Sequence, residues 1–300
     1  MKKILSLVLC VSVLAFGLLI LTGCPSEPAV NDPTNGTETY NGPDEGRPEA
    51  NGETSEAYAL YQRMNQAMAD VTSLDMDMEM TMEMTMEDIE IASTTTGRVQ
   101  QVFRSETDID MAITMVMTMT GYGDPITEES RIYFRNGRMY MESYGMKFYM
   151  EMDLEEALES LNSLDILDFS ERAIISANVS TVAGGNRKVK LVLEGDEIGE
   201  LMDTALASLE GMLGEIAGDV GIEFTSDVIL DFVIDENYML VSYRMAFEME
   251  VTAEGETVAM KMDTTMTINS INSITEINFP NDLDEYVSME EAMAAMFAMY

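Results

Sequence analysis

The stretch LDMDMEMTMEMTM at residues 74–86 alternates apolar and polar side chains at every step. Successive side chains of a β-strand point to opposite faces, so strict alternation is typical of a half-buried strand. Leu74 and the methionines at even positions share one side, which we call the methionine face. The Asp, Glu and Thr residues at odd positions share the other, the acidic face. The pattern predicts one long strand with two chemically opposite faces.

The alternation continues beyond this strand. After Asp88 the phase slips, which predicts a bulge or a turn there, and a further strand is expected near 98–104. Residues 109–119 again alternate methionine and isoleucine with Asp and Thr. The chain therefore carries several strands of the same two-faced type.

Four turn signals separate pairs of such strands and set registers in which apolar residues face one another. The predicted pairs are Phe134–Met139 and Ile132–Met141 around Asn136-Gly137, Val179–Leu191 around Gly184-Gly185-Asn186, Ile234–Met239 and Phe232–Val241 around Glu236-Asn237, and Val251–Val258, Met249–Met260 and Phe247–Met262 around Glu254-Gly255. Such hairpins predict a large antiparallel sheet with one apolar and one wet, acidic face.

Helical periodicity interrupts the strands. Apolar residues recur at three- and four-residue steps over 57–71, 153–161 and 197–216. Capping boxes are predicted at Asp153 with Glu156 and at Ser288 with Glu291, the latter opening a short C-terminal helix. The fold class is therefore α+β. The C-terminal helix could plug a cavity, lie on a sheet edge or bind a partner, and the sequence leaves these open.

The N-terminus has the form of a secretory signal. Lys2 and Lys3 precede an apolar run over 4–20, and Leu21-Thr22-Gly23-Cys24 follows it. This tetrapeptide resembles the lipobox of bacterial lipoproteins, which implies cleavage before Cys24 and a diacylglycerol on its thiol. A single-span anchor is the alternative, since the run is nearly long enough to cross a bilayer. The resemblance implies a lipid-anchored protein on the extracytoplasmic side of the cell membrane.

Composition divides the rest of the chain. Five of the seven prolines lie before residue 50, among Asn, Gly, Ser and Thr, which predicts a disordered tether. The predicted parts are a signal peptide at 1–23, the lipidated Cys24 and tether at 24–55, one domain at 56–287 and the short helix at 288–300.

Charge and residue usage exclude several functions. Removal of residues 1–23 leaves 14 basic and 55 acidic residues, a net charge of −41, so the chain is not expected to bind nucleic acid. There is no histidine, and Cys10 and Cys24 are the two cysteines. This rules out Cys–His and Ser–His catalysis and a zinc site of the usual kind. No phosphate loop or nucleophile elbow is found, so we predict a non-enzyme without a cofactor.

The order helix, meander, helices, meander, behind a lipobox and tether, resembles the LolA, LppX and LprG superfamily of periplasmic carriers and lipoproteins. Gram-positive lipoproteins with Met- and Asp-rich strands are especially similar. The resemblance covers about residues 56–287 and rests on element order and texture. It implies a curved, incomplete β-barrel whose concave face is covered by helices, with acyl chains held between them in several members. One relative is instead an envelope-stress sensor.

The methionines are the candidate site. They are unbranched and polarizable, and they adapt to irregular apolar partners. They could form an ordinary core, line a cavity for a lipid, or bind Cu(I) or Ag(I) through Met-X-Met thioethers. The candidate lining residues are Met76, Met78, Met80, Met82, Met84, Met111, Met115, Met117, Met249, Met260 and Met262.

Our main hypothesis is passive binding or transfer of a lipid or lipophilic ligand. The alternatives are an envelope protein-interaction or sensor module with a solid core, and Met-based metal binding. The acidic row that includes Asp75, Asp77, Glu79 and Glu83 fits a solvated face better than a Ca²⁺ site, because it lacks a wrapping loop. Aromatic residues near 133–149 are expected to pack one end of the sheet or to form a ligand mouth.

Overall fold

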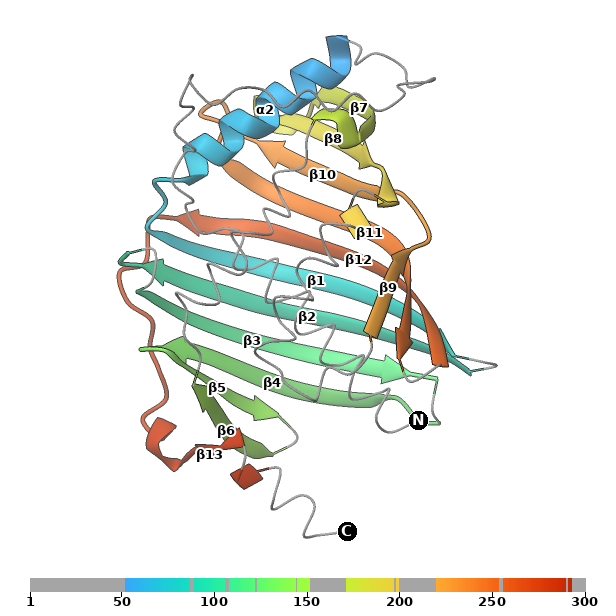
Figure 1. Cartoon of the computed structure of the whole chain (residues 1–300). Coiled ribbons are helices and arrows are strands. Elements are labelled where there is room, and N and C mark those ends of the chain that lie inside the picture. The colour runs from blue at the N-terminus through green and yellow to red at the C-terminus, as the bar shows by residue number, and fades with distance from the viewer. Residues whose placement is uncertain are drawn as a thin grey trace, which may run out of the picture.

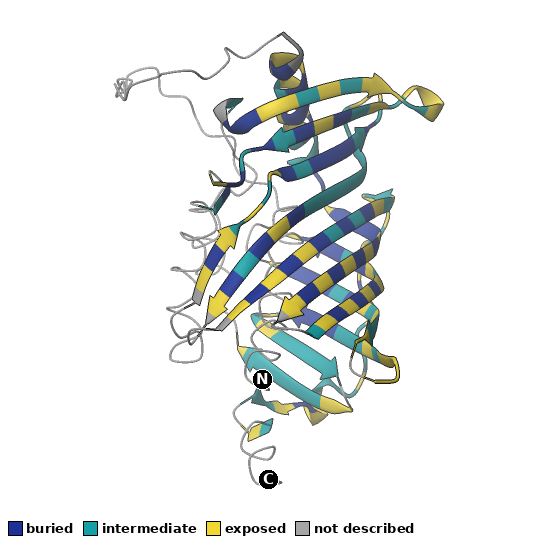
Figure 2. Ribbon diagram, turned by 90° about the vertical axis from the view of Figure 1, so that its right-hand side faces the viewer, coloured by how far each residue is buried: buried dark blue, intermediate teal, exposed yellow. Residues whose placement is uncertain are grey.

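A 13-stranded sheet dominates the structure, and its strands follow the order β13-β6-β5-β4-β3-β2-β1-β12-β11-β10-β8-β7, with β9 paired to β11 (Figure 1). Every pair is antiparallel except β13 with β6. The outermost strands, β13 and β7, do not pair with each other, so the sheet is open. Figure 2 shows the sheet curling from one edge to the other. The predicted large, curved, unclosed antiparallel sheet is confirmed.

This computed structural model describes residues 52–86, 89–105, 108–121, 123–143, 145–151, 171–196, 198–199, 220–253, 256–289 and 291–292. Its elements are α2 (Gly52–Met68), β1 (Ser73–Met86), β2 (Ile89–Phe103), β3 (Ile109–Thr120), β4 (Ile126–Arg135), β5 (Arg138–Ser143), β6 (Met146–Glu151), η1 (Glu171–Ala173), β7 (Ile174–Thr181), η2 (Ala183–Gly185), β8 (Arg187–Leu193), β9 (Val220–Phe224), β10 (Val228–Ile234), β11 (Leu240–Ala253), β12 (Glu256–Ile271), η4 (Leu283–Glu285) and β13 (Val287–Ser288). The predicted signal peptide, the lipobox and nearly all of the tether lie outside these ranges.

The alternating stretch at residues 74–86 forms most of β1, which pairs with β2 on one side and β12 on the other. The predicted strand over 109–119 is β3. The expected strand near 98–104 is the end of a longer strand, β2, which begins at Ile89. Since Met86 pairs directly with Ile89, the phase slip after Asp88 is the reversal of a hairpin. Figure 2 shows the resulting alternation of buried and exposed residues along the central strands.

Two predicted hairpin registers are confirmed. Asn136 and Gly137 have φ values of 53° and 70°, as a type I′ turn requires, and Phe134 pairs with Met139. In the β11–β12 hairpin, Met249 pairs with Met260 as predicted. Both turns are short, so the turn chemistry fixes the register of the strands that they join.

The other two registers were wrong by one or two residues. Val179 pairs with Val189, not Leu191, because the β7–β8 loop closes where the Val182 N–H donates to the Asn186 carbonyl at 2.8 Å. Gly184 and Gly185, both at φ 82°, complete the reversal within this loop.

In the β10–β11 hairpin, Phe232 pairs with Tyr243, not Val241, and Ile234 pairs with Leu240, not Met239. The Asp235 carboxylate accepts the backbone N–H groups of residues 237 and 239 at 2.8 and 2.9 Å, which lengthens the turn. A register shift beside Ile234 completes the change.

Helix α2 confirms the apolar stripe predicted over 57–71, although it begins earlier, at Gly52, and ends at Met68. Leu60, Tyr61 and Met64 are buried, and the Tyr61 ring lies 5.7 Å from that of Phe232 on β10. The helix packs against β7 and β8, so it covers one end of the methionine face. The predicted helix over 153–161 and nearly all of that over 197–216 lie outside the described residues. The expected helical cover of the concave face is therefore not shown.

The segment after β12 crosses the acidic face at the β4–β6 end. The Phe279 ring lies 6.0 Å from that of Tyr133, and the Tyr286 ring packs edge-on against Tyr140 at 5.6 Å. These contacts support packing of the aromatic residues at one end of the sheet. The predicted C-terminal capping box forms: Glu291 N–H donates to Ser288 Oγ at 3.2 Å, and Ser288 N–H donates to Glu291 Oε2 at 3.3 Å. The remainder of that predicted helix lies outside the described residues.

Gly97 on β2 allows close packing between neighbouring strands. A Cβ there would lie 2.7 Å from the Thr114 carbonyl oxygen and 3.2 Å from Met78 Cε. We expect Gly97→Ala to lower the free energy of unfolding by about 1–3 kcal/mol, because overpacking forces backbone to move. Urea denaturation measures this as a lower midpoint at unchanged slope.

Gly221→Ala on β9 is the matched control, since a Cβ at Gly221 meets no atom within 4 Å. That variant should be neutral or slightly stabilising, because alanine restricts the unfolded chain. Equal losses in the two variants would contradict the packing role of Gly97.

Candidate functional site

All eleven candidate methionines lie on one face of the sheet. Residues directly opposite each other on paired antiparallel strands share a face. Met84 on β1 pairs with Met260 on β12, which pairs with Met249 on β11. In the other direction, Met78 on β1 pairs with Gly97 on β2, which pairs with Met115 on β3. The methionine face thus continues from β11 through β12, β1 and β2 to β3.

Most of these side chains are removed from water. Met115 and Met117 are half-buried. The other nine are at most 8% exposed, namely Met76, Met78, Met80, Met82, Met84, Met111, Met249, Met260 and Met262. Burial of one such side chain stabilises a fold by about 1.5–3 kcal/mol. The face is thus a major source of stability, and its role in binding a ligand stays a prediction.

On strands β3, β11 and β12, three methionines outside the candidate set also belong to this face: Met119, Met245 and Met266, respectively. Met119 is opposite Ser93, Met245 is opposite Thr264, and Met266 is opposite Met78. The alternation of residues 258–266 carried the signal for Met266. The thioethers are spread over four strands, and Cu(I) or Ag(I) binding likewise stays a prediction.

Sequence reasoning missed a set of hydroxyl groups on the methionine face. Ser93 on β2 and Thr264 on β12 are at most 3% exposed. Among the described residues, Ser93 Oγ, Thr264 Oγ1 and Tyr243 OH on this face are buried without a hydrogen-bond partner. Burial raises the pKa of Tyr243, so its hydroxyl keeps its proton. The alternation of residues 258–266 places Thr264 on the methionine face, but nothing in the sequence indicates that its hydroxyl or that of Ser93 lacks a hydrogen-bond partner.

The acidic face is organised by ion pairs. Arg98 donates two hydrogen bonds to Asp75 at 2.8 and 2.5 Å, and this contact holds the pKa of Asp75 below its usual value. Asp110 on β3 accepts hydrogen bonds from Arg104 at 2.6 Å and from Arg135 at 3.1 and 2.7 Å. Asp75 is thus an ion-pair partner within the acidic row that we weighed as a Ca²⁺ site. Within the described ranges, no three acidic side chains gather as metal ligands would.

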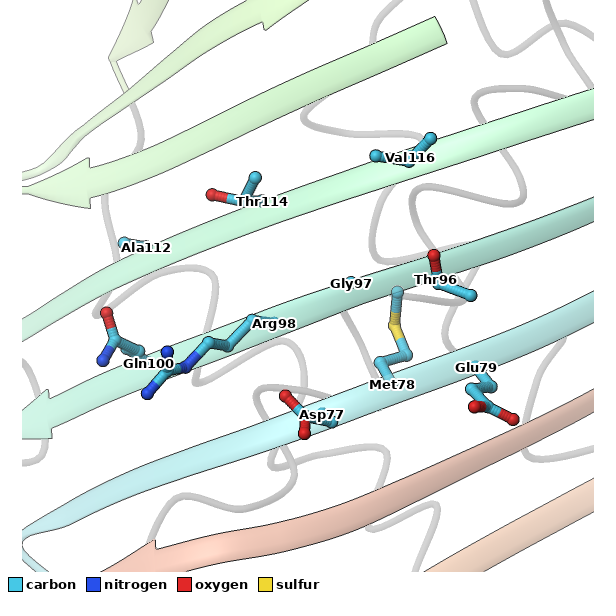
Figure 3. Close-up of a pocket in the computed structure, with 10 residues that line it drawn as sticks. All are labelled: Asp77, Met78, Glu79, Thr96, Gly97, Arg98, Gln100, Ala112, Thr114 and Val116. Atoms are coloured by element: carbon cyan, nitrogen blue, oxygen red, sulfur yellow. The ribbon is translucent and has the colours of Figure 1, made fainter. Parts of the chain in front are cut away.

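An open groove of about 650 Å³ runs over β1, β2 and β3. Figure 3 shows Asp77 on β1 near Arg98 on β2, with Glu79 farther along β1 on the side of Thr96. The other lining residues are Met78, Thr96, Gly97, Gln100, Ala112, Thr114 and Val116. Its charged residues, two acids and one arginine, lie on the acidic face, and the arginine is already paired with Asp75. The groove is therefore an open, polar surface of the acidic face.

Together these features define an open antiparallel half-barrel with one buried methionine face and one ion-paired acidic face. The model of the family of unknown function DUF6612 matches residues 56–286, and the chain belongs to this family. No curated protein matches the sequence. No helix within the described ranges is long and apolar enough to cross a membrane.

Several solved structures are similar to the chain. LprF from Mycobacterium bovis is 13% identical at a TM-score of 0.37, covering 75% of this chain and 97% of that one. A DUF1329 family protein from Desulfovibrio piger is 11% identical at 0.28, covering 77% and 98%. A domain described as an outer membrane lipoprotein-sorting protein, from Vibrio parahaemolyticus, is 10% identical at 0.20, covering 77% and 97%.

Proposed function

We propose that this chain is a membrane-anchored extracytoplasmic lipoprotein that binds a lipid or lipophilic ligand against its methionine face, without catalysis. The observation that carries the proposal is the continuity of that face across five strands, from β11 to β3. The lipobox at Cys24 supports the anchor, with a covalent diacylglycerol as its membrane-embedded part.

The choice of methionine supports a ligand more than a plain core. Valine and isoleucine are stronger strand formers, and methionine specifies a core loosely. Surfaces that accept varied apolar partners are instead rich in methionine, because its side chain repacks at low cost. A methionine face on otherwise regular strands therefore fits a deformable lining.

Native mass spectrometry of the full chain purified from a bacterial host tests this proposal. We expect a bound species of lipid mass that leaves on organic extraction, whereas the diacylglycerol on Cys24 stays attached. Bare lipoprotein that regains no lipid from vesicles would contradict lipid binding and leave the anchor standing.

A pair of neighbouring variants locates the site. Met115 is half-buried on the methionine face, and Val116 is 40% exposed on the acidic face. Met115→Asp should lower the bound lipid at least about tenfold, because a carboxylate against an acyl chain loses its water without gaining a partner. Val116→Asp should leave the bound lipid unchanged. Equal lipid content in both variants would place the ligand elsewhere.

A further inference from the structure

The three unpartnered hydroxyls lie in the middle of the methionine face. Thr264 on β12 is opposite Met80 on β1, and Ser93 on β2 is opposite Met82. Tyr243 on β11 is opposite Met266 on β12, one position along the same face from Thr264. Thr264 and Tyr243 are therefore diagonal neighbours, about 7–8 Å apart at their backbones. Ser93 lies roughly 12 Å from Thr264 at the backbone, on the other side of β1 and two residues along the strand direction.

A buried hydroxyl without a hydrogen bond destabilises a fold, and native proteins leave few such groups. Three on one face, each opposite a methionine of a neighbouring strand, are out of keeping with a core selected for stability alone. Valine in place of Thr264, or phenylalanine in place of Tyr243, would keep the shape and remove the cost of desolvation. The hydroxyls are explained when something absent from the protein chain accepts their hydrogen bonds.

The surroundings restrict what that group can be. Paired residues on β11, β12, β1, β2 and β3 form rows that run across the strands, and each of the three rows that hold these hydroxyls contains only neutral residues. In that strand order, the rows are Phe247, Met262, Met82, Ser93 and Met119; Met245, Thr264, Met80, Thr95 and Met117; and Tyr243, Met266, Met78, Gly97 and Met115. A carboxylate or phosphate placed there would be buried without a cation, at high cost. A neutral acceptor such as an ester carbonyl has no such cost.

We propose that the ligand is an acyl-ester lipid whose carbonyl oxygens accept hydrogen bonds from Thr264 and Tyr243 at one place and from Ser93 at another. This inference rests on the proposed function and adds the ligand's chemical class. The acyl chains lie along the methionines, and the esters lie over the hydroxyls. An ether lipid with the same chains would fill the same apolar space but lack the carbonyl acceptors.

Dioctanoylglycerol and dioctylglycerol, which differ in the two ester carbonyls, are the test pair. Each displaces an environment-sensitive fluorescent acylglycerol, which is neutral, from the full chain. We expect the wild type to bind the ester at least about tenfold more tightly than the ether, since each neutral hydrogen bond contributes roughly a two- to tenfold change in affinity. Thr264→Val should lower this preference by the contribution of one hydrogen bond, about two- to tenfold, and change ether binding less than about twofold.

Thr265→Val is the matched control, because Thr265 is the next residue of β12 and pairs with Glu79 on the acidic face. It should retain the ester preference. The melting temperature of ligand-free Thr264→Val should be unchanged or raised, whereas a hydroxyl with a purely structural role would make it fall.

Four results would overturn the inference: equal affinity of the wild type for ester and ether, an ester preference that Thr264→Val leaves unchanged, loss of that preference in Thr265→Val, or a fall in the melting temperature of Thr264→Val. Each of them leaves lipid binding standing as long as both lipids displace the probe. Failure of both lipids to displace the probe would reject the inference and the proposed function together.

Discussion

Replacement of Met82 by aspartate is expected to lower the free energy of unfolding by about 4–5 kcal/mol, enough to unfold a marginally stable domain. Met82 is 5% exposed, between Met262 on β12 and Ser93 on β2. The variant loses the burial of a thioether side chain and places a carboxylate among neutral groups. Urea denaturation followed by circular dichroism measures the loss.

Thr81→Asp is the control for this variant. Thr81 is the preceding residue of β1 and is exposed on the acidic face, opposite Asp263. Repulsion between the two carboxylates should cost less than about 1 kcal/mol. If Met82→Asp were as stable as Thr81→Asp, the methionine face would be open to water, and the description of a buried face would be wrong.

The second large effect is expected at Asp110, where Asp110→Asn should cost about 3 kcal/mol. Its side chain is 1% exposed and accepts hydrogen bonds from two arginines, Arg104 and Arg135. Charged hydrogen bonds contribute about 1.5–3 kcal/mol each, and loss of one member of a buried ion pair is strongly destabilising. The Arg135 guanidinium also lies 3.9 Å from the Phe279 ring, so the C-terminal segment should loosen as well.

The same carboxylate makes stability depend on pH. Burial raises the pKa of Asp110, but the hydrogen bonds from Arg135 and Arg104 outweigh burial and leave the pKa below the usual 3.8. A carboxyl with a lowered pKa in the folded state contributes stability that is present above pH 3.8 and is lost as the pH falls through the lower folded value.

Urea denaturation of the wild type and of Asp110→Asn, measured from neutral to acidic pH, tests the direction of this pH dependence. The difference in the free energy of unfolding between wild type and Asp110→Asn should become smaller as the pH falls below 3.8. Relief of repulsion among the many acids affects both proteins alike and cancels in the difference. A gap of constant size down to acid would show that Asp110 is not ionised in the folded protein.

Much of the architecture could be predicted from local sequence. The alternation of residues 74–86 fixes which side chains of β1 share a face, because the strand period is two. Asn136-Gly137 fixes its hairpin because both residues adopt positive φ at low cost. The eleven candidate methionines were found on these grounds alone, and the structure places all of them on one face.

Other features depended on contacts between distant residues. The register of β10 with β11 changed because the Asp235 side chain binds two backbone N–H groups across the turn, and no periodicity contains that information. Asp110 appeared to be one of many surface acids until Arg135, 25 residues away, was placed beside it. The missing hydrogen-bond partners of Ser93 and Thr264 could not be predicted for a similar reason, because the groups beside these hydroxyls come from neighbouring strands.

The sequence by itself determined the two-faced strands, the antiparallel class of the sheet and the lipobox that predicts a membrane anchor. These follow from side-chain order along the chain, where the physical rule is local. Only the tertiary structure decided that the methionines of β1, β3, β11 and β12 form one continuous face, that Gly97 leaves room for Met78, and that hydroxyls lie within that face. These depend on which strands are neighbours, and strand neighbours are chosen by the summed packing of the whole sheet.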